Sequence, residues 1–175
     1  MTTTKSKGFI HIYTGNGGGK TTAALGVAMR ALGQGRRVAV VQFMKGRKDI
    51  GEYKIQKKLR GFNIYQFGRK EFVDLKHPAE VDVELANEAL GFAKELMREK
   101  IRPDILILDE VNIAAAYKLI DSSAVVSMLK QVPKGVDVYL TGRHAPKELM
   151  KIADFVTQVE DVKRTNAPAR KGIDY

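Results

Sequence analysis

Residues 9–22 read FIHIYTGNGGGKTT, an apolar run followed by a cluster of glycines and then by a lysine and two threonines. This pattern predicts a strand over residues 8–13, a turn, and a helix that begins at Lys20. In a glycine-rich turn of this kind, backbone N–H groups can crowd around phosphate oxygens, and the helix N-terminus adds its positive end. The segment therefore predicts a polyphosphate site, in which Lys20 reaches a terminal phosphate and the hydroxyl of Thr21 ligates Mg²⁺.

The segment departs from the general phosphate-binding loop, G-x-x-x-x-G-K-[ST], at one position, because Thr14 stands where the first glycine is usual. The alternative interpretation is an ordinary glycine-rich turn followed by a chance lysine. The strand predicted before it and the helix predicted after it favour phosphate binding. The residues expected to bind the nucleotide here are Thr14, Gly15, Asn16, Gly17, Gly18, Gly19, Lys20, Thr21 and Thr22.

Length and composition favour one globular domain. The chain has 175 residues, of which 44% are hydrophobic and none is cysteine, which excludes disulfides and thiolate metal sites. Neither a membrane-spanning stretch nor a signal peptide is evident, so we expect a cytoplasmic protein without a membrane partner. We expect a flexible tail over residues 1–7, a nucleotide-binding domain over 8–160, and a basic tail over 161–175 that packs on or near the site.

The net charge of +10 is concentrated in two clusters of lysine and arginine. The first cluster lies in residues 45–60 and the second in residues 163–171. Such clusters attract nucleotides, nucleic acids or acidic proteins, although an ordinary solvated basic face has the same composition.

Apolar runs with strand and helix periodicity alternate along the chain. The sequence predicts strands over 8–13, 37–43, 62–67, 105–108, 136–140 and 155–159, and helices over 20–32, 52–60, 79–100, 112–131 and 146–152. Repeated strand–helix units with short connections indicate an α/β fold, in which helices cover both faces of a mostly parallel central sheet. Ligand sites in such folds lie at the carboxyl ends of the strands.

An acidic pair, Asp109 and Glu110, directly follows the predicted strand 105–108. Carboxylates at the end of a buried strand next to the strand that precedes the loop can hold Mg²⁺ together with Thr21. The alternative is a pair of helix-capping acids. We assign Thr21, Asp109 and Glu110 as metal ligands, and the same residues with Lys20 as catalytic.

Other polar residues follow strands that should end at the same edge of the sheet. Gln42 and Lys45 come at the end of the second predicted strand, and Arg143 follows the strand 136–140. We expect these side chains to contact the ligand, with Arg143 on a phosphate or a carboxylate. The histidines show no metal-ligand spacing, and His11 is interpreted as an ordinary strand residue.

Several blocks of the sequence together resemble one family, the P-loop ATP:corrinoid adenosyltransferases. The matching blocks are YTGNGGGKTTAALG at 13–26, QF at 42–43 with KG at 45–46, LILDE at 106–110, LTGR at 140–143 with AP at 145–146, AD at 153–154, and GIDY at 172–175. They occur in the family's order over nearly the whole chain, and Thr14 at the start of the loop is itself typical of the family. The resemblance implies a P-loop NTPase-like (RecA-like) three-layer sandwich.

The resemblance also implies a reaction in which a reduced corrinoid, such as cob(I)alamin, attacks the 5′ carbon of the ATP ribose and the whole triphosphate leaves. It implies that ATP, Mg²⁺ or Mn²⁺, and a corrinoid bind, with no further bound cofactor. The family is usually a homodimer, and a flavoprotein reductase that docks on the basic surface is an expected partner.

Aromatic residues in a loop before the long helix are expected, by the same resemblance, to fill the lower face of the corrinoid. Phe72 is the first candidate and Phe67 the second, and the chain has no tryptophan. Phe72 as a core residue is the alternative. Gly18 stands where many members carry lysine, which removes one cation that would face the phosphates.

Two other classes of function fit parts of the sequence. A P-loop kinase or hydrolase would use the same loop, but no base for a second substrate is evident. A basic nucleic-acid-associated ATP-binding protein would fit the charge, but aromatic residues are only 7% and no nucleic-acid motif is present. We therefore expect no nucleic-acid partner.

Overall fold

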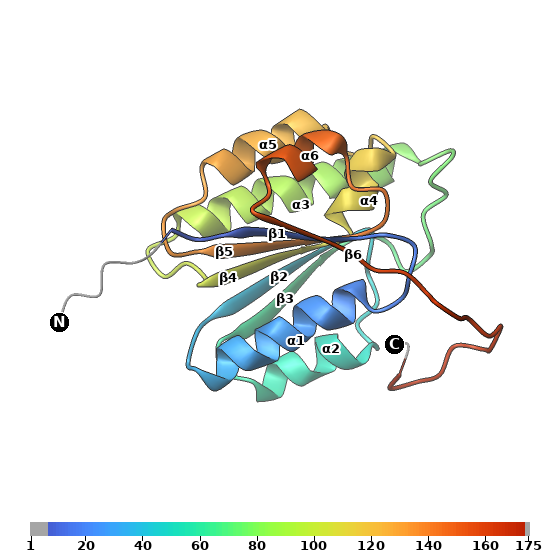
Figure 1. Cartoon of the computed structure of the whole chain (residues 1–175), viewed down its shortest axis with the longest axis horizontal. Helices are drawn as coiled ribbons and strands as arrows, with labels where there is room; N and C mark the ends of the chain where they lie inside the picture. Colours follow the sequence, from blue (N-terminus) through green and yellow to red (C-terminus); the bar gives the residue numbers. More distant parts are fainter. Residues whose placement is uncertain (1–6, 174–175) are drawn as a thin grey trace.

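The central layer is a parallel sheet with the strand order β3-β2-β4-β5-β1-β6 (Figure 1). The computed structural model describes residues 7–173. In that part of the chain the strands are β1 (Ile10–Thr14), β2 (Val38–Phe43), β3 (Phe62–Phe67), β4 (Ile105–Asp109), β5 (Asp137–Thr141) and β6 (Phe155–Gln158). All of them run parallel, which agrees with the predicted fold class.

Helices cover both faces of this sheet, as predicted. Figure 1 shows α1 (Lys20–Gly33) and α2 (Gly51–Ile55) on one face, with α3 (Glu80–Arg98), α4 (Val111–Ala116), α5 (Ser122–Lys130) and α6 (Lys147–Ile152) on the other. A 3-10 turn, Gln56–Lys58, follows α2. None of the helices within residues 7–173 has the length and apolar character that a membrane span requires.

The hydrophobic core lies in two layers, one on each face of the sheet. Small side chains of α1, among them Ala24 and Ala28, pack on Val40 and Ile107. Leu106 and Leu108 face the opposite side, where they pack among residues of α3, α4 and α5. Strands β2 and β4 are buried along their whole length, because each has a neighbouring strand on both edges and helices over both faces.

Helix boundaries were predicted less well than strands. The single helix expected over 112–131 is wrong, because α4 ends at Ala116 and α5 begins at Ser122. Lys118 between them has a φ of 60°, and Asp121 caps α5 by accepting a hydrogen bond from the N–H of Ser123. The helix expected over 52–60 is also too long, since α2 gives way to the 3-10 turn at Gln56. The long helix runs over 80–98 rather than 79–100.

The strand order corrects one further expectation. We expected the strand that ends in Asp109 to lie next to β1, but β5 lies between β4 and β1. This order arises from long-range pairing, in which Ile12 is opposite Leu140, and Leu140 is opposite Leu108. The insertion of β5 places its last residue, Thr141, beside Asp109.

Candidate active site

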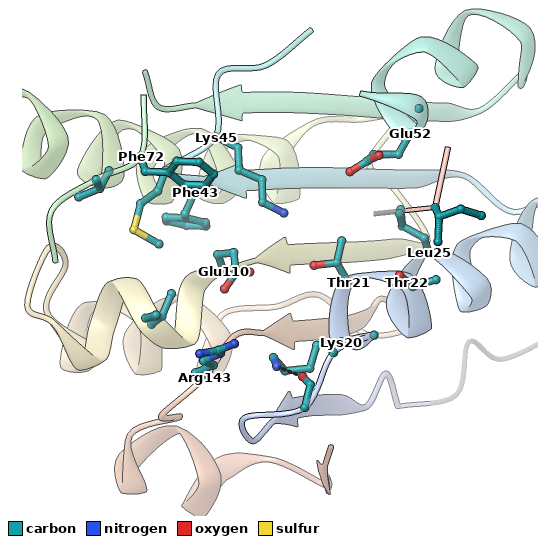
Figure 2. Close-up of a pocket in the computed structure, with 18 of the residues that line it drawn as sticks. Lys20, Thr21, Thr22, Leu25, Phe43, Lys45, Glu52, Phe72, Glu110 and Arg143 are labelled. Atoms are coloured by element: carbon teal, nitrogen blue, oxygen red, sulfur yellow. Dashed lines mark hydrogen bonds between the residues drawn. The ribbon is translucent and has the colours of Figure 1, made fainter. Parts of the chain in front are cut away.

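A cleft of about 1020 Å³ opens at the carboxyl ends of the strands, where the topology of a parallel α/β sheet places ligand sites. The second half of the glycine-rich loop borders it, together with Lys45, Phe72, Glu110 and Arg143 (Figure 2). Thr14, Gln42 and Asp109 are buried and do not line it. Gly15 and Asn16 border a smaller cavity of about 410 Å³, which Arg143 also lines. The structure therefore divides the predicted residues between the cleft, the cavity beside it and the layer beneath.

The loop joins β1 to α1 through backbone conformations that suit glycine. Gly19, which precedes the first helical residue, has a φ of 95°, and Gly15 has a φ of 96°. The ammonium of Lys20 is held inside the loop, where Nζ donates to the carbonyl oxygen of Gly17 at 2.5 Å. Burial, and then the positive charge of Arg143, lower the pKa of Lys20. An anion that binds beside these two cations would oppose that shift.

Two glycines of the loop have a role that the sequence did not reveal. A Cβ atom at Gly15 would clash with the carbonyl oxygen of Val159, and one at Gly17 would lie 2.7 Å from the carbonyl carbon of Glu160. The chain that follows β6 therefore packs directly on the loop. Close packing of backbone on backbone therefore explains why glycine is needed at these positions, in addition to the phosphate binding that the sequence predicts.

The carboxylate of Asp109 is the centre of a buried polar network beneath the cleft. Its Oδ1 accepts hydrogen bonds from the hydroxyls of Thr21 and Thr141, each at 2.7 Å. Its Oδ2 accepts hydrogen bonds from Nζ of Lys45 at 2.6 Å and from Nε2 of Gln42 at 3.1 Å. Burial alone would raise the pKa of Asp109, but the charge of Lys45 and these hydrogen bonds lower it, so the carboxylate stays ionised.

Polar residues at two strand ends complete this network and were not predicted as site residues. Thr141 also accepts a hydrogen bond from the N–H of Glu110 at 3.0 Å. Gln66, near the end of β3, donates to Oε1 of Gln42 at 2.9 Å and so fixes the orientation of that amide. Their position at the carboxyl ends of strands could have indicated Thr141 and Gln66 as site residues. The neighbours that they contact, however, depend on the strand order.

Glu110 differs from Asp109 in backbone conformation and in the direction of its pKa shift. It has a φ of 65°, and its side chain makes no capping hydrogen bond to α4, so the helix-capping alternative does not describe it. Burial and the neighbouring Asp109 raise the pKa of Glu110, although Lys45, Lys20 and Arg143 oppose the rise. Gly142 packs against it, because a Cβ atom there would lie 3.2 Å from Oε2 of Glu110. The close packing keeps this carboxylate at the wall of the cleft.

The residues present fit a magnesium ion. The Thr21 hydroxyl and the Asp109 carboxylate are in direct contact, and Glu110 adds a second carboxylate at the wall of the cleft. Oxygen ligands of this kind suit Mg²⁺. Within residues 7–173 there is no cluster of three or more histidine or acidic side chains that would enclose a metal by itself. Mg²⁺ usually keeps several waters and binds substrate phosphates, so an incomplete set of protein ligands is compatible with it.

One wall of the cleft is apolar. Phe43, Val73, Leu75 and Ile113 contribute to it, and Phe72 also lines the cleft. Phe72 is 96% exposed, so the alternative that it is a core residue is wrong. The second aromatic candidate, Phe67, does not line the cleft and packs instead on Phe92 with ring centroids 5.3 Å apart.

His11 is a strand residue, as predicted. Its ring lies stacked on Tyr139, with centroids 4.3 Å apart, and on Phe155, with centroids 4.7 Å apart. The end of the described chain reaches the site, because Gly172 and Ile173 line the main cleft.

Comparison with known proteins identifies the family. Residues 6–175 match the family described as ATP:corrinoid adenosyltransferase BtuR/CobO/CobP. The chain belongs to this family. The match covers the loop, the acidic pair and the strand ends that surround the cleft, so the family resemblance found in separate sequence blocks extends over the whole described structure.

Several individual relatives that match nearly the whole chain are also named corrinoid adenosyltransferases. A protein named corrinoid adenosyltransferase from Sinorhizobium sp is 38% identical over 99% of this chain and 83% of its own length. The corrinoid adenosyltransferase of Escherichia coli K12 is 34% identical, covering 97% of this chain and 86% of its own length. Corrinoid adenosyltransferase CobA of Salmonella typhimurium LT2 is 33% identical over 98% of this chain and 87% of its own length.

Proposed function

We propose that this protein transfers the 5′-deoxyadenosyl group of ATP to the cobalt of a reduced corrinoid and releases triphosphate, in the synthesis or salvage of adenosylcobalamin. The observation that carries this proposal is the shape and chemistry of the cleft. It joins the glycine-rich loop to an apolar wall in one space of about 1020 Å³. The relatives that match nearly the whole chain are named corrinoid adenosyltransferases, which supports the same substrates.

The loop and the strand ends bind the nucleotide and stabilise the leaving group. Backbone N–H groups of residues 18–22, with Lys20 and Arg143, would face the triphosphate, on which negative charge develops as the C5′–O bond breaks. Thr21 and Glu110 line the cleft and would hold Mg²⁺ or Mn²⁺, with Asp109 acting from beneath through the hydroxyl of Thr21, and the ion would supply further positive charge to the triphosphate. The electron pair of cob(I)alamin forms the cobalt–carbon bond, and the bonding electrons of the C5′–O bond leave with the triphosphate.

The apolar wall positions the corrinoid. Correct placement of the cobalt in line with the C5′–O bond removes much of the entropic cost of the reaction. Phe72 extends from the loop before α3 and is almost fully exposed at the cleft, where a flat apolar ligand would cover it. We assign it to the lower face of the corrinoid, where an aromatic ring displaces the lower axial ligand and makes reduction of the cobalt easier.

The electron donor and the assembly state complete the proposal. Lys48, Lys54, Lys57 and Lys58 are exposed beside the cleft-lining residues of α2, and an acidic flavoprotein reductase would dock on such a surface. We therefore expect the rate of electron delivery to fall as ionic strength rises. An electron-delivery rate that does not change between low and high salt would contradict this docking site. We also propose that the protein is a cytoplasmic homodimer, as the sequence led us to expect.

An anaerobic assay tests the function. The protein is mixed with chemically reduced cob(I)alamin, ATP and Mg²⁺, and the absorbance is followed. Formation of light-sensitive adenosylcobalamin, abolished by Lys20→Ala, is the expected result. Release of ADP or phosphate with no corrinoid product would instead support a kinase or hydrolase that shares only the fold.

A further inference from the structure

The chain that leaves β6 crosses the glycine-rich loop and puts a carboxylate on it. The N–H of Gly17 donates to the carbonyl oxygen of Val159 at 2.9 Å, which fixes the crossing point. Two residues further on, Oδ1 of Asp161 accepts a hydrogen bond from the N–H of Gly18, also at 2.9 Å. A negatively charged side chain therefore accepts a hydrogen bond from one of the N–H groups that a loop of this kind offers to phosphate.

The Asp161 carboxylate is held loosely enough to be displaced. Its side chain is 32% exposed, and its ion pair with Arg164 is long, at 3.4 Å between the nitrogen and the oxygen. Its negative charge also favours the protonated form of Lys20. Burial has the larger effect, so the pKa of Lys20 is still lowered overall. Asp161 thus interacts with the loop amide of Gly18 and with the loop ammonium of Lys20, as a phosphate group would.

We propose that Asp161 is an internal competitor of the triphosphate for the loop. In the nucleotide-free protein its carboxylate accepts the hydrogen bond of the Gly18 N–H, and it is displaced when a triphosphate binds. When the triphosphate leaves, the carboxylate returns and satisfies the amide, which favours release. The part that concerns product release rests on the proposed function, in which the whole triphosphate is the leaving group, whereas the competition requires only that the loop binds anions.

Displacement of Asp161 also affects the segment that follows it. The segment that Asp161 anchors continues to Gly172 and Ile173, which line the main cleft. Between these points residues 162–171 are exposed. Loss of the anchor on Gly18 would therefore loosen a segment whose end borders the cleft.

Removal of the carboxylate tests the competition by the sign of its effect. Affinity for inorganic triphosphate with Mg²⁺ is measured by calorimetry, without corrinoid, for the wild type and for Asp161→Ala. Competition predicts that the dissociation constant falls by about fivefold to tenfold, because a charge-assisted hydrogen bond no longer has to be broken. A dissociation constant that rises or stays the same would show that Asp161 only supports the loop, and would overturn the proposal.

A neighbouring carboxylate gives the matched control. Glu160→Gln also removes one negative charge beside the loop, but Glu160 accepts its hydrogen bond from Gln158 and not from a loop amide. We expect this variant to change the dissociation constant by less than about twofold. Equal tightening in both variants would indicate general electrostatics and overturn the proposal. Asp161→Ala also removes the ion-pair partner of Arg164, which could then bind the triphosphate itself. Repeating the comparison in an Arg164→Gln background removes that contribution.

Two further measurements keep the inference testable if Asp161→Ala does not fold. Asp161→Asn keeps an oxygen that accepts the Gly18 hydrogen bond but removes the charge, so a smaller tightening in the same direction is expected. In the wild type, triphosphate should increase tryptic cleavage after Lys163 and Arg164, and protection there would contradict the proposal. Because these experiments contain no corrinoid, their results do not depend on whether the transferase assay succeeds.

Discussion

Nζ of Lys45 lies 2.6 Å from Oδ2 of Asp109, so a side chain at the wall of the cleft neutralises a carboxylate that is completely buried. Burial would lower the pKa of Lys45, but the charge and the hydrogen bond of Asp109 raise it. The two groups hold each other in their charged forms. The charge of the Asp109 carboxylate, which accepts the hydrogen bond of the proposed magnesium ligand Thr21, therefore depends on this lysine.

The first prediction concerns this pair. Lys45→Met should lower kcat/KM for MgATP by about tenfold or more, because Asp109 loses the charge that keeps it ionised and oriented. Steady-state kinetics with varied MgATP and fixed cob(I)alamin measure the effect. Lys48→Met, which removes an exposed lysine from the same basic cluster, is the control and should change kcat/KM by less than about twofold. Equal effects of the two variants would contradict a specific role of the pair.

The second prediction concerns Thr141, whose hydroxyl donates to Asp109 and accepts from the N–H of Glu110. Thr141→Val keeps the shape but leaves that N–H without its hydrogen bond, so the free energy of unfolding should fall by about 2 kcal/mol. Urea denaturation measures the change. Thr157→Val on the exposed strand β6 is the matched control and should be close to neutral. Wild-type stability of Thr141→Val would mean that the hydroxyl contributes little.

The third prediction is a pH dependence of stability at Asp82. Hydrogen bonds from the side chain of Arg69, at 2.8 Å, lower the pKa of this carboxyl below its ordinary value of 3.8, and the N–H of Ala79 adds to the effect against burial. Because the pKa is lower in the folded state, the stabilisation is present above about pH 4 and is lost as the pH falls through the folded pKa.

Asp82→Asn should therefore be less stable than the wild type by about 2 kcal/mol at pH 7, and the difference should shrink below pH 4. Chemical denaturation at a series of pH values measures it. This difference is modest because Arg69 is 38% exposed, and solvent screens its charge. A difference that stays constant from pH 7 to pH 2 would show that ionisation of Asp82 does not contribute.

The fourth prediction separates reduction from transfer at Phe72. Phe72→Ala should impair turnover from cob(II)alamin plus a reductase, and should affect turnover from chemically reduced cob(I)alamin much less. Since the ring is almost fully exposed, the melting temperature should change little. Val162→Ala, which truncates another fully exposed apolar side chain outside the lining of the cleft, is the control. Unchanged turnover from cob(II)alamin would remove Phe72 from this role.

The sequence was sufficient for features that depend on local patterns. The six strands lie within two residues of their predicted positions, because apolar runs bounded by polar residues define them. The break between α4 and α5 could have been predicted as well, since Asp121 followed by Ser122 and Ser123 is a helix-start signal. The apolar residues on both sides of that signal obscured it.

Features that depend on long-range pairing could not be predicted. The contact of Thr141 with Asp109 follows from the insertion of β5 between β4 and β1, which no local pattern specifies. The contact of Asp161 with Gly18 joins residues 143 positions apart. The need for glycine at positions 15 and 17 was attributed to phosphate alone, because the packing of Val159 and Glu160 on the loop appears only in the folded chain.

The identity of the phosphorus product tests the central claim most directly. In an anaerobic reaction of cob(I)alamin with MgATP, ³¹P nuclear magnetic resonance would measure the phosphorus species while absorbance measures adenosylcobalamin. The account predicts one inorganic triphosphate for each adenosylcobalamin formed, and neither product with Lys20→Ala. Formation of ADP and phosphate, or of AMP and pyrophosphate, without adenosylcobalamin would contradict it.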